Sequence, residues 1–115
     1  EINMLVKKNL INGCANITGG GILNNLTRVI PNKYTLNINL SKVKTLKIFK
    51  WLKSKNINDK EMLNTFNCGV GFCLIANKKN VKKIKKIFSK EYKPYEIGFI
   101  SKEKSKVKTF GKLQW

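Results

Sequence analysis

The chain has 115 residues, of which 42% are hydrophobic and 10% are aromatic. This length suits one folded domain, and the composition excludes an intrinsically disordered chain. The formal net charge of +18 predicts attraction for nucleic acid or another polyanion.

The first third of the chain predicts helix, strand, glycine turn and helix in that order. Apolar residues at near-helical spacing predict a helix from residue 2 to about residue 12. Residues 14–18 predict a short strand that runs directly into the glycines at 19–21. Apolar residues between 22 and 29 predict a short helix, which Pro31 ends because proline cannot continue it.

The middle of the chain predicts one strand and two helices. Residues 34–40 alternate apolar and polar side chains, which predicts a half-buried strand with its polar side in water. A broad apolar stripe over residues 42–55 predicts an amphipathic helix. Asn58 is a candidate cap for a further short helix, with Glu61 at the third helical position.

The last third of the chain predicts the remaining sheet. Residues 70–76 are apolar on both faces, as in a central strand that helices cover on each side. Residues 81–88 predict a helix, and residues 95–100 and 107–110 predict two closing strands with a lysine-rich turn between them. We therefore expect an α+β fold of mixed α/β layers, a single domain over 1–115 with one central mixed sheet flanked by helices.

The segment Thr18-Gly19-Gly20-Gly21 is the first candidate for chemistry. Without Cβ atoms, backbone N–H groups can close around an anion at a helix N-terminus. The structural alternative is a tight turn where the helix packs close to the sheet. The segment is not a P-loop, because the Gly-Lys-Ser/Thr ending is missing.

A second glycine motif lies at the entrance of the predicted central strand. Its glycines, Gly69 and Gly71, follow Asn67 and allow a ligand or another backbone to approach closely. Close strand packing is the structural alternative.

The cysteines and the absence of histidine restrict the chemistry further. Cys14, Cys68 and Cys73 make an odd number, which indicates a reducing compartment, and we expect the cytoplasm. No convincing four-ligand metal set exists, and the lack of His excludes Ser-His and Cys-His nucleophiles. No apolar run is long enough to span a membrane, and the missing start methionine suggests a fragment.

The high charge has two interpretations. Of the 24 basic residues only Arg28 is arginine, whereas bidentate recognition of bases or phosphates favours arginine. Lysine and asparagine instead crowd neutral surface positions, as the codon usage of an AT-rich genome would produce. We expect no specific nucleic-acid partner, and a stand-alone basic module that binds RNA or DNA is the alternative.

Several ordered blocks of the sequence carry a resemblance to a known family. Residues 15–31 read A-N-I-T-G-G-G-I-L-N-N-L-T-R-V-I-P and resemble the A-H-I-T-G-G-G block of aminoimidazole ribonucleotide synthetases, which ends in P-R-V-(L/I)-P. Residues 48–52 resemble that family's (V/I)-F-x-W-L. Residues 61–71 resemble its E-M-(L/Y)-R-T-F-N-C-G-(V/I)-G, and residues 97–100 its I-G-x-I.

The resemblance implies an ATP- and Mg²⁺-dependent phosphoribosylformylglycinamidine cyclo-ligase, a C–N ligase of purine biosynthesis. Such an enzyme converts formylglycinamidine ribonucleotide to 5-aminoimidazole ribonucleotide and works as a homodimer. The chain would be the larger part of the C-terminal domain, inactive alone because the N-terminal ATP-binding domain is absent. The resemblance implies a loop that faces phosphate or substrate, formed by Thr18, Gly19, Gly20 and Gly21. It also implies a nearby cation, Arg28. Residues that line the cleft or support its structure would be Asn67, Gly69 and Gly71.

The sequence also departs from the family pattern. Asn16 stands where the family usually has His, which keeps a hydrogen-bonding side chain but removes a titratable one. Asn24 and Thr27 replace Glu and Pro, and Asn64 replaces a common Arg. A further alternative is therefore a structural relative that keeps the fold and has lost activity.

Overall fold

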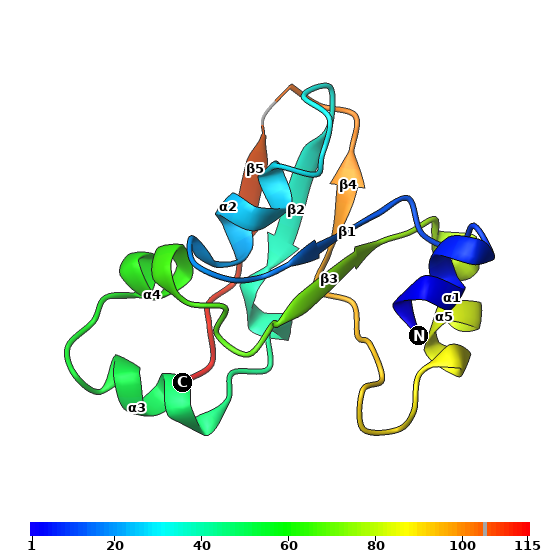
Figure 1. The fold of residues 1–115 in the computed structure, drawn as a ribbon. Coiled ribbons are helices and arrows are strands. Elements are labelled where there is room, and N and C mark those ends of the chain that lie inside the picture. The colour runs from blue at the N-terminus through cyan, green and yellow to red at the C-terminus, as the bar shows by residue number, and fades with distance from the viewer. Residues whose placement is uncertain (105) are drawn as a thin grey trace. The chain divides into compact units, whose positions relative to one another are not determined.

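The computed structural model describes residues 1–104 and 106–115. It contains short helices, two short 3-10 turns and two small sheets (Figure 1). The elements in chain order are α1 Ile2–Lys7, β1 Gly13–Asn16, α2 Gly21–Thr27, β2 Thr35–Asn39, η1 Leu40–Lys42, α3 Lys47–Lys53, α4 Asp59–Thr65, β3 Phe72–Ile75, η2 Lys78–Asn80, α5 Val81–Ile87, β4 Gly98–Ser101 and β5 Val107–Phe110.

The chain forms two compact units, and the smaller one comprises residues 1–14 and 74–96. Its core is built by Leu5, Leu10 and Ile84, with partly buried neighbours such as Ile87 from α5. The predicted first helix is confirmed but ends at Lys7, earlier than residue 12. The helix stops because Asn9 has a φ of 50°, a left-handed conformation that helical residues do not adopt.

The larger unit comprises residues 15–73 and 97–115 and contains the three-stranded sheet. β2 is its central strand, antiparallel to β4 and parallel to β5 (Figure 1). This confirms the α+β class and the mixed sheet. The two predicted closing strands therefore lie on opposite sides of β2.

The prediction that the polar side of this strand faces water was wrong. Thr35 is 0% exposed and Asn37 is 7% exposed. Both side chains form hydrogen bonds within the protein, to β4 and to the segment that follows it. The Asn37 side-chain amide donates to Ser101 Oγ at 2.9 Å, and the Thr35 hydroxyl donates to the Glu103 carbonyl at 3.1 Å. Buried polar groups persist where they are paired in this way.

The prediction of a central strand at 70–76 was also wrong. The observed strand β3 spans Phe72–Ile75 and pairs only with β1, in a two-stranded sheet. Phe72 is 45% exposed, so this strand is not covered on both faces. An apolar run indicates burial or an unfilled interface, and the sequence alone does not distinguish them.

The predicted helix over 42–55 is shorter in the structure. α3 begins at Lys47, because Val43 has extended backbone angles after the 3-10 turn η1. Its apolar stripe is not buried: Ile48 and Trp51 are each 55% exposed.

The predicted helix after Asn58 is confirmed together with its cap. The Asn58 side-chain oxygen accepts a hydrogen bond from the Glu61 backbone N–H at 2.9 Å, and α4 follows directly. Met62 and Leu63 on α4 are buried in the larger unit. α4 packs against α2, which brings the two glycine motifs of the sequence near each other.

Candidate functional site

The first glycine motif forms a closed turn between β1 and α2. The Gly21 N–H donates to the Thr18 carbonyl at 3.1 Å, and Gly20 has a φ of 92°. Such a φ favours glycine, because a side chain would clash with the backbone. The predicted order of strand, glycine turn and helix is confirmed.

Gly21 serves helix packing. Its φ is +64°, and a Cβ atom at this position would lie 1.8 Å from the Leu63 carbonyl oxygen on α4. A side chain is therefore impossible unless α2 and α4 separate. The alternative of a tight turn with close packing applies to this glycine.

Asn25 holds the turn from inside and was missed by the sequence analysis. Its side-chain amide donates to the carbonyls of Gly21 at 2.7 Å, Gly19 at 3.2 Å and Thr18 at 3.4 Å. Asn25 is 8% exposed. The available signal was an asparagine four residues after Gly21, which places it one helical turn along the same face.

This arrangement orients the peptide groups of the turn. In a trans peptide the C=O and N–H point in opposite directions, and the described chain has no cis peptide. Because the Thr18 and Gly19 carbonyls face the Asn25 amide, the N–H groups of Gly19 and Gly20 are directed away from it. Successive N–H groups presented together by a turn form a concavity that suits an anion.

The segment before the turn exposes alternate side chains. Ile17 is 2% exposed, whereas Asn16 and Thr18 on either side of it are exposed. Gly19 is also exposed, and a Cβ atom there would meet nothing within 4 Å. Asn16, Thr18 and Gly19 thus present polar groups and open space along one exposed edge.

The second glycine motif is a turn of a different kind. The Asn67 side-chain oxygen accepts from the Gly69 N–H at 3.0 Å, and its carbonyl accepts from the Val70 N–H at 2.8 Å. Cys68 and Gly69 have φ values of 51° and 104°, as in a type I′ turn. A Cβ atom on Gly69 would lie 2.5 Å from the Lys44 carbonyl oxygen, so the backbone packs closely at this glycine.

Gly71 connects the two motifs. Its carbonyl accepts a hydrogen bond from the Ile17 N–H at 2.9 Å, which places it beside the segment that carries Asn16 and Thr18. A Cβ atom on Gly71 would meet nothing within 4 Å, and the residue is exposed. The structure therefore brings together Asn16, Thr18, Gly19 and Gly71 as the candidate site.

Arg28 is placed differently. It follows the last residue of α2, so the whole helix separates its backbone from the glycine turn. A helix of this length is roughly 10 Å long. The main chain does not bring Arg28 next to the turn.

Two of the cysteines, Cys68 and Cys73, have the properties of structural thiols. Burial, followed by the nearby Asp59 charge, raises the pKa of Cys68 to about 11, and burial raises the pKa of Cys73 to about 11. Both thiols stay protonated at neutral pH and are poor nucleophiles or metal ligands.

The donor set does not fit a magnesium ion. Within residues 1–104 and 106–115, no group of three or more His, Cys, Asp or Glu side chains gathers in one place. Mg²⁺ is held in proteins by carboxylate and phosphate oxygens. The candidate-site residues carry no carboxylate side chain, so no step at this site is assigned to a protein-bound metal.

A surface hollow is formed by residues outside the candidate site. It is a shallow depression near the C-terminal end of α2 and contains none of the predicted site residues. The hollow is lined by Thr27, Ile30, Pro31, Asn32, Tyr34 and Lys106.

In the described part of the chain, no helix is long and apolar enough to cross a membrane.

Comparisons with known proteins agree with this fold and its glycine motifs. Residues 1–110 match the family model described as AIR synthase related protein, C-terminal domain. The chain belongs to this family, and the resemblance found in the sequence is confirmed.

The relatives with curated names give a more specific result. The chain is 40% identical over 102 residues to a protein named phosphoribosylformylglycinamidine cyclo-ligase from Ligilactobacillus salivarius, covering 87% of this chain and 30% of that protein. It is also 40% identical over 102 residues to the Streptococcus pneumoniae protein of the same name, covering 88% of this chain and 29% of that protein. The chain therefore spans less than a third of the length of these relatives.

Proposed function

We propose that this chain supplies a substrate-facing part of a phosphoribosylformylglycinamidine cyclo-ligase. The reaction is the ATP-dependent conversion of formylglycinamidine ribonucleotide to 5-aminoimidazole ribonucleotide, in which a C–N bond closes the imidazole ring. The relatives carry this name, and the chain shares their C-terminal domain. The chain alone is inactive in this proposal, because the relatives are more than three times as long as the matched segment.

The observation that carries the proposal is the orientation of the Thr18–Gly21 turn. Asn25 binds the carbonyl groups, so the Gly19 and Gly20 N–H groups face the other way. The space beside Gly19 is open. This geometry supports a role in binding a phosphate group of the ribonucleotide or of ATP.

ATP and Mg²⁺ are held mainly by the part of the enzyme outside this chain. The candidate site offers backbone N–H groups and uncharged side chains, which suit an anion and not a metal ion. Lysines over the whole surface add a favourable long-range field for anionic nucleotides. Arg28 contributes to this field as an exposed cation at the far end of α2.

Asn16 stands where the family usually has His, so the proposal must assign it a role that needs no titratable group. Its side chain is exposed beside Thr18 and can donate and accept hydrogen bonds, but it cannot titrate. In this proposal Asn16 orients the substrate and leaves proton transfer to other groups. Asn16→His tests this: unchanged turnover supports it, and a ~10²-fold gain would show a damaged site in an inactive relative.

The proposal includes the assembly and compartment of the enzyme. We place it in the cytoplasm, which the three free cysteines of the described chain support. Its protein partners are the N-terminal ATP-binding domain and a second copy of the whole enzyme in a homodimer.

A chimeric enzyme tests the function. This chain replaces the 102 matching residues of the Ligilactobacillus salivarius protein, and ADP release is followed with and without formylglycinamidine ribonucleotide. Substrate-dependent ADP and aminoimidazole ribonucleotide are the expected products. A folded chimera that releases no ADP, beside an active parent enzyme, would contradict the proposal.

A further inference from the structure

One face of the three-stranded sheet carries two exposed aromatic rings. Asn37 on β2 pairs with Phe99 on β4, and Asn39 pairs with Phe110 on β5. Directly paired residues in a sheet project from the same face. Phe99 and Phe110 therefore share the face of Asn37, and they are 58% and 46% exposed.

On the opposite face of the same sheet, the side chains of the central strand β2 are buried. Leu36 and Ile38 project there and are 6% and 0% exposed. The Asn37 side of β2 is buried as well, but on that face the flanking strands β4 and β5 expose Phe99 and Phe110 to solvent. Exposed rings gathered on one surface mark an interaction site more often than isolated apolar residues do.

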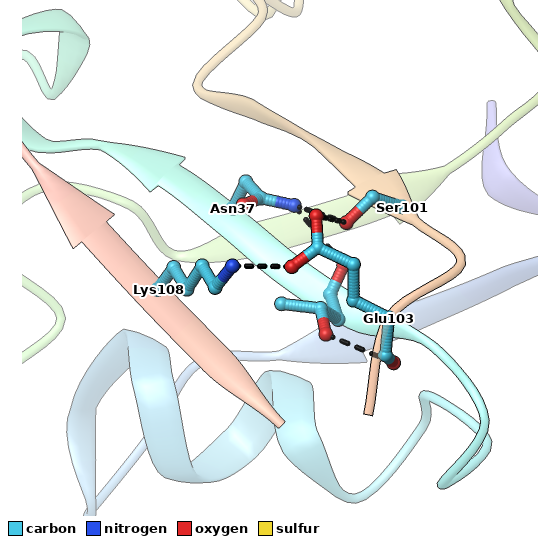
Figure 2. A network of polar contacts seen from close by, with 5 residues as sticks. Asn37, Ser101, Glu103 and Lys108 are labelled. Carbon is cyan, nitrogen blue, oxygen red and sulfur yellow. Dashed lines mark hydrogen bonds and ion pairs between the residues drawn. The ribbon is translucent and has the colours of Figure 1, made fainter. Parts of the chain in front are cut away.

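The rest of the aromatic face is a closed polar network, shown in Figure 2. The Asn37 amide donates to Ser101, and the Lys108 ammonium is paired with the Glu103 carboxylate. Among the described residues, no buried side-chain nitrogen or oxygen lacks a hydrogen-bond partner. A partner can cover this network without leaving a buried group unsatisfied.

We propose that this face docks a protein segment from the part of the cyclo-ligase outside this chain. The inference rests on the proposed function. The segment places apolar side chains over Phe99 and Phe110, and acidic side chains near the exposed lysines that adjoin β4 and β5 in the chain. These lysines are Lys102, Lys104, Lys106 and Lys112.

Length and charge identify this occupant. About 70% of each relative lies outside the matched segment, which is ample to supply a covering element. A second copy of this chain would bring a second charge of +18 to the interface, and like charges oppose association. A nucleic acid would meet the Glu103 carboxylate on the face itself, and Lys108 is already paired with that carboxylate.

Binding between purified pieces tests the docking surface. This chain is mixed with the separately produced remainder of the Ligilactobacillus salivarius enzyme, and calorimetry measures the affinity. The positive control is the matching C-terminal piece of that same enzyme, which shows whether the enzyme can be divided at this place and still reassemble. We expect the present chain to bind, and the double variant Phe99→Glu with Phe110→Glu to bind ~30-fold more weakly or worse.

Matched variants separate docking from folding. Tyr92→Glu adds a charge at another exposed aromatic residue, 65% exposed in the smaller unit, and should change the affinity less than about 2-fold. Phe99→Leu with Phe110→Leu keeps an apolar surface and should retain most of the binding. Circular dichroism confirms that each variant is folded.

Several outcomes would overturn the docking proposal. One is the absence of binding when the positive control binds, and another is equal binding by the double Glu variant. A third is that this chain associates with itself or binds a single-stranded oligonucleotide, and that the double Glu variant loses this binding whereas Tyr92→Glu keeps it. The face would then be assigned to a second copy of the chain or to nucleic acid. Substrate-dependent ADP release from the mixed pieces is read separately: binding without turnover supports docking and contradicts the proposed function.

Discussion

The two glycine turns look alike in sequence but use their peptide groups in opposite ways. In the first turn, the Asn25 amide binds carbonyl oxygens, and the N–H groups of Gly19 and Gly20 face away from it. In the second turn, Asn67 accepts from the Gly69 and Val70 N–H groups. The Gly69 and Val70 N–H groups of the second turn are used within the turn, which is why the proposed anion site is assigned to the first turn.

Each turn also contains one packed glycine and one glycine with open space. Gly21 lies against α4 and Gly69 lies against the Lys44 carbonyl, whereas Gly19 and Gly71 have no atom in the way of a Cβ. A glycine-rich motif is therefore not a single signal. Its packed member supports the fold, and its open member is available for function.

The largest expected effect is that of Gly21→Ala. The new Cβ would overlap the Leu63 carbonyl oxygen at a positive φ, so the free energy of unfolding should fall by ~3 kcal/mol or more. Urea denaturation measures the loss, and Gly19→Ala is the control, with an expected change within ~0.5 kcal/mol. Equal stability of the two variants would break the distinction between packed and open glycines.

Gly69→Ala should be the next most damaging change. Its Cβ would lie 2.5 Å from the Lys44 carbonyl oxygen, at a φ of +104°, and the expected loss is ~2 kcal/mol. The matched control is Gly71→Ala, two residues away, which should be nearly neutral in the same denaturation experiment. A larger loss at Gly71 than at Gly69 would contradict the assigned roles.

The two asparagines that hold the turns should differ in importance. Asn25→Ala removes the buried side-chain donor that three carbonyl oxygens of the first turn share and should cost ~2 kcal/mol. Asn67→Ala removes one side-chain hydrogen bond, to the Gly69 N–H, and should cost ~1 kcal/mol. If Asn67→Ala proves the more destabilising of the two, the first turn is not held as described.

The second turn should also respond to alkaline pH. Burial raises the folded-state pKa of Cys68 to about 11 from 9.0, so the folded state holds this proton more tightly than the unfolded state. The protonated Cys68 thiol therefore contributes ~1–2 kcal/mol to the free energy of unfolding. This contribution is complete below pH 9 and is lost as the pH rises towards 11. Cys68→Ala should show a shallower decline of stability over this range. Parallel declines would mean that Cys68 does not titrate as described.

The sequence predicted the local elements better than their environments. The glycine turn, the Asn58 cap and the helix at 81–88 follow from local rules, and the structure confirms them. The burial of Asn37 and the exposure of Trp51 could not be predicted, because both depend on which distant segments lie beside them. Strand pairing and interfaces are properties of the whole fold.

The candidate site shows the same division. The order of residues correctly predicted a turn at Thr18–Gly21 between a strand and a helix, but it could not separate Gly21 from Gly19. That separation depends on where α4 lies. The role of Asn25 depends on side-chain geometry across one helical turn, which no spacing rule specifies for asparagine.

The most direct test of the site compares one added charge at two positions in the chimeric enzyme. Gly19→Asp adds a carboxylate in the open space beside the Gly19 and Gly20 N–H groups, and Asn32→Asp adds one at an exposed position beyond the C-terminal end of α2. We expect Gly19→Asp to raise the KM for formylglycinamidine ribonucleotide or for ATP at least ~10-fold, because like charges repel. Asn32→Asp should leave both values unchanged. Equal kinetics for the two variants would show that the turn does not face an anionic substrate.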